Sequence, residues 1–80
     1  MNLTNADLLI QRASNNLQKW GPQGLKTLGL AVAEETGELA QAILQYEYED
    51  GDLQRVYQEA IDLGALCLQV MEHFDGDHKP

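Results

Sequence analysis

Leu30-Ala31-Val32-Ala33-Glu34-Glu35-Thr36-Gly37-Glu38-Leu39-Ala40 is the stretch that decides both the fold and the chemistry of this chain. It is rich in Ala and Leu, which favour helices, and its apolar run is interrupted by three carboxylates. Because each helical residue turns the chain by about 100°, these three side chains project into one arc of roughly 100°. The stretch therefore predicts a helix with an acid cluster on one side.

A second acidic pair, Glu59 and Asp62, lies further along the chain in Glu59-Ala60-Ile61-Asp62. Its spacing places the two carboxylates about 60° apart on another helix. Two helices with clustered carboxylates predict a site for divalent metal ions. Oxygen ligands without imidazole or thiolate select a hard cation, Mg²⁺ or Mn²⁺ in its place.

The apolar spacing predicts three helices, over about residues 4–20, 25–47 and 52–74, with turns at Gly21-Pro22 and Asp50-Gly51. Short turns between long helices indicate a small antiparallel bundle, so we expect one all-α domain over residues 1–80. The third helix carries apolar residues over half its circumference and is therefore expected to be central.

The middle helix carries a second apolar strip in addition to its main apolar stripe: Leu30, Ala33, Ala40 and Leu44. Gly37 lies on that flank and is expected to let a neighbouring backbone come close. A chain of 80 residues buries a modest core, and its single cysteine excludes an intrachain disulfide. We therefore expect the core to be completed by oligomerisation, as a homodimer or a dimer-of-dimers tetramer.

The formal net charge of −8 opposes binding to polynucleotides and to anionic membranes. It leaves a mononucleotide possible, because bound magnesium reverses the local charge. No apolar run approaches twenty residues, and the N-terminus has neither a basic region nor an apolar segment of a signal peptide. We expect a soluble, cytoplasmic protein.

The simplest alternative for the acids is a solvated helix face, since Glu34 and Glu38 share their side with polar residues. Two observations favour a metal site instead. Glu34 and Glu38 repel each other at the i,i+4 spacing, with no Lys or Arg at helical spacing nearby. Glu35 and Glu59 lie at the edges of apolar stripes, where an unpaired carboxylate is costly.

Glu34-Glu35-Thr36-Gly37-Glu38, followed by Glu59-Ala60-Ile61-Asp62, resembles the split E-E-x-x-E … E-x-x-D motif of the MazG-like all-α nucleoside triphosphate pyrophosphohydrolases. The resemblance covers about residues 18–74. It implies Mg²⁺-dependent cleavage of a (deoxy)nucleoside triphosphate between the α and β phosphates, which gives a monophosphate and pyrophosphate.

By this resemblance Glu35, Glu38, Glu59 and Asp62 match the metal ligands. Glu34 matches the more variable first acid, which is either an outer ligand or the catalytic base that orients water.

The resemblance also places the base pocket near the first turn, where Trp20 is the candidate stacking platform and Lys26 a candidate phosphate contact. The alternatives are a core anchor for Trp20 and a solvated side chain for Lys26. Family members commonly continue into a fourth helix that helps to hold the phosphates, and this chain shows no obvious one. Phosphate binding would then depend on the metals, on Lys26 or Arg55, or on a neighbouring subunit.

Two further interpretations of the whole chain remain open. The first is a non-catalytic helical module with the same fold that senses nucleotides or binds a protein partner. The second is a purely structural bundle, for which Mg²⁺ would not change the melting temperature.

Overall fold

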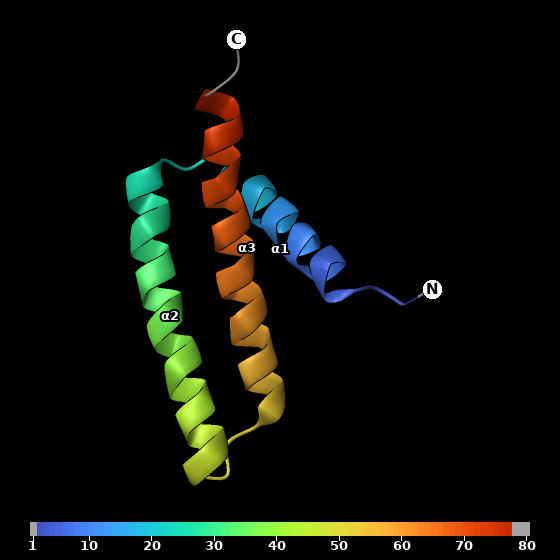
Figure 1. Ribbon diagram of the computed structural model, residues 1–80, viewed down its shortest axis with the longest axis vertical. Coiled ribbons are helices and arrows are strands. Elements are labelled where there is room, and N and C mark those ends of the chain that lie inside the picture. Colours follow the sequence, from blue (N-terminus) through green and yellow to red (C-terminus); the bar gives the residue numbers. More distant parts are fainter. Residues whose placement is uncertain (1, 78–80) are drawn as a thin grey trace.

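The computed structural model describes residues 2–77 and forms an all-α bundle of three helices (Figure 1). Helix α1 spans Asn5–Trp20, α2 spans Leu25–Tyr48 and α3 spans Leu53–Asp77. Helices α2 and α3 lie side by side and run antiparallel, while α1 packs obliquely against the other side of α3. The expected fold class and the central position of the third helix are confirmed.

Helix α1 begins with a capping box. Thr4 Oγ1 accepts a hydrogen bond from the Asp7 backbone N–H at 3.1 Å, and Asp7 Oδ2 accepts one from the Thr4 N–H at 3.0 Å. The hydrogen bond with the Thr4 backbone is the main reason why the pKa of Asp7 lies below its usual value, and the hydrogen bond with the Thr4 side chain lowers it further. These bonds satisfy two N–H groups that the first helical turn leaves without partners.

The turn between α2 and α3 is tight and fits the expected Asp50-Gly51 signal. Asp50 has a positive φ of 59°, and the Gly51 N–H donates to the Gln45 carbonyl at 2.8 Å. A Cβ on Gly51 would lie 2.7 Å from the Gln45 carbonyl carbon. Glycine is needed here because backbone, rather than a movable side chain, occupies that space.

Among the described side chains of this bundle, three of the six buried residues are alanines. The buried side chains among residues 2–74 are Ala13, Leu28, Ala42, Ile61, Ala65 and the polar Gln69. Helices α1 and α3 come close at Gly64, where a Cβ would lie 2.7 Å from Leu9 Cδ2. Gln69 is satisfied by the Asn16 amide, which donates to its Oε1 at 3.0 Å.

One detail differs from the sequence-based expectations, and another stays a prediction. A Cβ on Gly37 would have no atom within 4 Å in the single chain, so the backbone approach expected there stays a prediction for the oligomer. Helix α3 continues past Phe74 to Asp77 and includes Gly76. A glycine lowers helix stability by about 1 kcal/mol but does not by itself end a helix.

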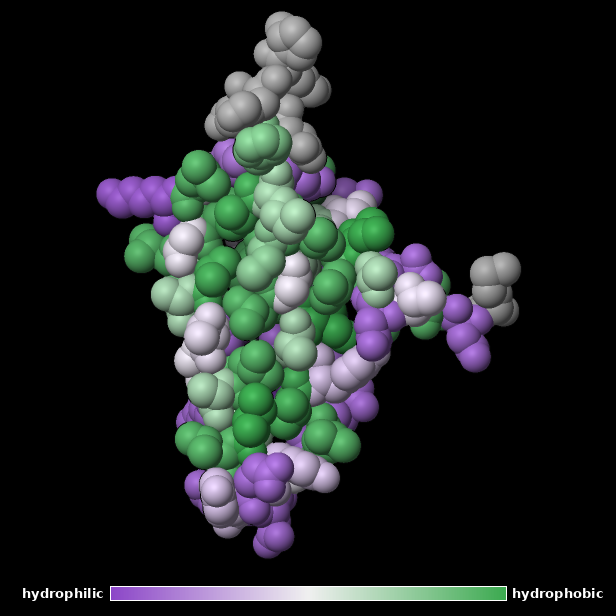
Figure 2. Space-filling view, in the orientation of Figure 1, coloured by the Kyte–Doolittle hydropathy of each residue, from purple (hydrophilic) through white to green (hydrophobic). Residues whose placement is uncertain are grey.

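Much apolar surface stays exposed in the single chain. Figure 2 shows a largely hydrophobic face along α2 and α3, with hydrophilic residues gathered at the end that holds the α2–α3 turn. Leu30 and Leu44, from the second apolar strip of α2, are 67% and 55% exposed. On α1, Ile10 and Leu17 are exposed as well. Within residues 2–77, none of the helices is both long and apolar enough to cross a membrane.

Candidate functional site

Glu35 lies in the middle of the α2 face that packs against α3. The less exposed residues of α2 recur every three or four positions: Leu28, Ala31, Val32, Glu35, Glu38, Leu39, Ala42 and Gln45. Because these residues share one face of α2, the face that carries Glu35 and Glu38 packs against α3. Glu35 is half-buried, as its position at the edge of an apolar stripe predicts, and Glu38 is half-buried as well.

Three carboxylates meet between α2 and α3. Glu35, Glu38 and Glu59 each offer an oxygen atom, and these atoms all lie within 4.8 Å of one another. Among the described residues, Glu35 Oε2 is a buried oxygen without a hydrogen-bond partner. Burial of the carboxylate is the largest cause that raises the pKa of Glu35 to about 7, and the negative charges of Glu38 and Glu59 add to it. We call these three residues the acid cluster.

The acid cluster offers ligand atoms of the kind that a hard cation would take. Its donors are all carboxylate oxygens, which Mg²⁺ and Mn²⁺ prefer. Opposite ligands of Mg²⁺ stand about 4.2 Å apart, so small side-chain movements would bring these oxygens to the required distances. A cation would also give the buried Glu35 Oε2 a partner and relieve the repulsion among the carboxylates.

Asp62, the fourth ligand implied by the motif, lies outside the acid cluster. Its Oδ1 forms an ion pair with Arg12 Nη1, so it connects α3 to α1. The structure thus brings three of the four implied ligands together and holds the fourth on a guanidinium group.

A pocket of about 330 Å³ lies beside the acid cluster. All three helices and the first turn contribute to its lining: Asn16, Trp20, Gln23, Ala31, Glu34, Glu35, Asp62 and Leu66. Four of the residues predicted from the sequence, from Trp20 to Asp62, therefore meet in one place. The pocket lining combines an aromatic ring with carboxylates.

Trp20 stands at the end of α1 with 62% of its surface exposed, so it does not anchor the core of the single chain. The Lys19 ammonium group lies 5.0 Å from the centre of its ring, within the range of a cation–π contact. An exposed indole at the edge of a pocket is available for stacking on a planar ligand.

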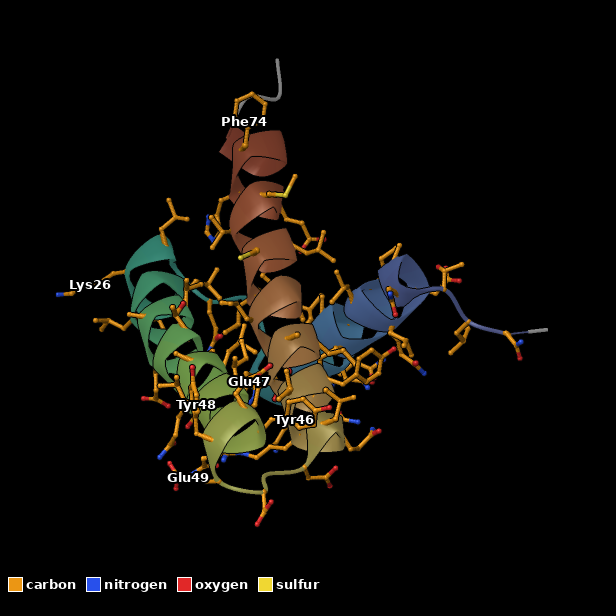
Figure 3. All side chains as sticks on the ribbon, turned by 60° about the horizontal axis from the view of Figure 1, so that its bottom comes forward. Lys26, Tyr46, Glu47, Tyr48, Glu49 and Phe74 are labelled. Atoms are coloured by element: carbon orange, nitrogen blue, oxygen red, sulfur yellow. The ribbon has the colours of Figure 1, made fainter. Side chains whose placement is uncertain are left out.

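Lys26 is exposed and extends away from α3 (Figure 3), and it does not line the pocket. Arg55, the other cation considered for phosphate binding, donates to Gln45 at the α2–α3 turn. Neither side chain lies where a phosphate chain in the pocket would be.

Arg12 was missed as a site residue, because its neighbours in the sequence place it on the polar side of α1. The residue spacing could have identified it. Arg12, Asn16 and Trp20 are four residues apart, so they share one helix face.

Comparisons with protein-family models, with curated proteins and with solved structures find no match to this chain. The functional interpretation therefore depends on the acidic residues and their geometry.

Proposed function

We propose that this protein is a Mg²⁺-dependent pyrophosphohydrolase of (deoxy)nucleoside triphosphates that removes unwanted or surplus nucleotides. The observation that carries the proposal is the meeting of Glu35, Glu38 and Glu59 from two helices, with one carboxylate oxygen of Glu35 buried and unpartnered. An all-α fold and the motif spacing are consistent with the MazG-like resemblance. Mn²⁺ is expected to replace Mg²⁺.

In this proposal the acidic residues divide two tasks. Glu35, Glu38 and Glu59 would hold the cation, and Asp62 on the pocket wall would join them as a ligand. Bound Mg²⁺ would neutralise phosphate charge and make the attacking water more acidic. Glu34 lines the pocket and would orient that water and accept its proton. The water oxygen attacks the α phosphorus, the bond to the bridging oxygen breaks, and pyrophosphate leaves.

Trp20 would stack on the nucleobase, because its exposed ring borders the same pocket as Glu34 and Asp62. Lys26 is left out of the proposed phosphate site, because its side chain extends away from α3.

The exposed apolar side chains of α2 support the further proposal that the active form is a homodimer or a dimer-of-dimers tetramer. A cytoplasmic location is part of the same proposal, because both the nucleotides and the cation are abundant there.

One observation favours a second candidate function. Asp62 pairs with Arg12, which leaves three carboxylates in the acid cluster. A module with this arrangement would bind a metal–nucleotide complex as a sensor without hydrolysing it.

Pyrophosphate release from a panel of (d)NTPs, with and without Mg²⁺, tests the proposal. We expect Mg²⁺-dependent release that falls at least about 100-fold in Glu38→Gln, because a metal ligand supplies several kcal/mol. Glu47→Gln, an exposed carboxylate near the end of α2, is the matched control and should retain full activity. Nucleotide binding without product would support the sensor instead. Neither binding nor release would indicate a structural bundle.

A further inference from the structure

The ion pair between Arg12 and Asp62 joins residues that line two different pockets. Asp62 lines the pocket that contains Trp20 and Glu34, whereas Arg12 lines a neighbouring pocket between α1 and α3. Arg12 Nη2 also lies 3.4 Å from Gln58 Oε1. The two charged side chains are 35% and 31% exposed, so solvent reaches the pair. Partly exposed ion pairs contribute little to stability, and a competing ligand can therefore displace one partner.

The pocket needs a positive group that the other cations do not supply. Among the described residues that line it, none is Lys or Arg. Lys26 extends away from α3, and Arg55 is bonded to Gln45. Lys19 lies over the ring of Trp20 and does not line the pocket. Of the described cations, Arg12 is the one bonded directly to a side chain of the pocket wall.

We propose that Arg12 competes with the cation for Asp62 and binds the phosphate chain once Asp62 has turned to the metal. This inference rests on the proposed function. In the metal-free protein, Arg12 keeps the fourth carboxylate away from the acid cluster. When the cation draws Asp62 to itself, the guanidinium group is released beside an incoming phosphate. Arg presents N–H groups in a planar fork that matches phosphate oxygens, which suits it to this exchange.

The first test measures Mg²⁺ binding to the full chain by calorimetry, without nucleotide. Arg12→Gln removes the competing charge, so we expect Mg²⁺ to bind about 2- to 5-fold more tightly than to the wild type. Arg55→Gln, which removes the same charge from a site bonded to Gln45, should bind Mg²⁺ as the wild type does. Unchanged or weaker Mg²⁺ binding by Arg12→Gln would overturn the inference.

A second test separates the exchange from a purely structural role of the pair. If Arg12 binds phosphate, the KM for a Mg²⁺–nucleotide complex should rise about 10-fold in Arg12→Gln, and Arg12→Lys should recover part of the loss. A lower melting temperature of Arg12→Gln with no change in Mg²⁺ affinity or KM would show that the pair only fastens α1 to α3. That result would also overturn the inference.

The wild-type protein provides a readout that does not require a folded variant. Side-chain ¹⁵N NMR signals of Arg12 should shift when Mg²⁺ is added, because the ion pair opens. Signals that stay unchanged while Mg²⁺ binds would contradict the exchange but leave the proposed hydrolase intact. A wild-type chain that binds no Mg²⁺ would refute both.

Discussion

Glu35 of α2 and Glu59 of α3 hold carboxylate oxygens within 4.8 Å of each other, across the interface between the two longest helices. Glu38 adds a third carboxylate to the same place. A fold selected for stability alone would fill this position with apolar side chains, because clustered and partly buried carboxylates are unfavourable. The arrangement lowers local stability unless a bound group neutralises the carboxylates.

Stability of the metal-free protein should depend on the ionisation of Glu35. The pKa of this group rises from an ordinary 4.5 to about 7 in the folded state, which therefore binds the proton more tightly than the unfolded state does. The stabilisation is complete below about pH 4.5 and is lost as the pH rises through about 7. We expect the free energy of unfolding to fall over this window, measured by urea denaturation.

Glu35→Gln should remove this decrease, because the amide does not ionise. Glu47→Gln, on the exposed side of α2, should keep the wild-type pH dependence. An equally steep decrease in Glu35→Gln would assign the effect to other groups.

The turn between α2 and α3 should not tolerate a side chain at Gly51. Gly51→Ala places a Cβ 2.7 Å from the Gln45 carbonyl carbon, so the turn must shift. We expect a loss of about 1–3 kcal/mol in thermal or urea unfolding. Gly29→Ala, in α2 with nothing within 4 Å of the new Cβ, should instead stabilise the protein by about 1 kcal/mol. The same sign for both substitutions would contradict the described turn.

The N-terminal cap of α1 should contribute measurably to stability. Thr4→Ala removes the hydroxyl that accepts the Asp7 N–H, and we expect a loss of about 1 kcal/mol. Thr27→Ala is the matched control, because Thr27 is exposed inside α2 and should change stability by less than about 0.5 kcal/mol. Equal effects in chemical denaturation would show that the capping box is not formed in solution.

The exposed apolar strip of α2 should mediate the proposed association of chains. The double variant Leu30→Gln/Leu44→Gln replaces two side chains that are 67% and 55% exposed, and its mass by light scattering should be that of a monomer. Tyr48→Gln, an exposed residue at the end of α2, should keep the wild-type mass. A monomeric wild type would refute the oligomer, whereas a variant of unchanged mass would place the interface elsewhere.

Helical periodicity was sufficient to predict the fold. The spacing of apolar residues, together with glycine and proline at the turns, located all three helices, and the wide apolar arc of the third helix predicted its central position. The burial of Glu35 was also predictable, because the carboxylate lies beside the main apolar stripe of its own helix. These features depend on residues close together in the sequence.

Contacts between distant residues could not be predicted in the same way. The Arg12–Asp62 pair depends on how α1 crosses α3, and a pattern within one helix does not determine that crossing. For the same reason the close approach of Leu9 to Gly64 was not predicted. Ile10 and Leu17 follow the apolar spacing of α1, yet they stay exposed in the single chain, because only part of that helix packs against α3.

Calorimetric titration with Mg²⁺ tests most directly whether Glu35, Glu38 and Glu59 form a metal site. The account predicts saturable binding to the wild type, a strong loss of affinity in Glu38→Gln and Glu59→Gln, and unchanged affinity in Glu47→Gln. Equal affinity in all four proteins, or no saturable binding to the wild type, would contradict it.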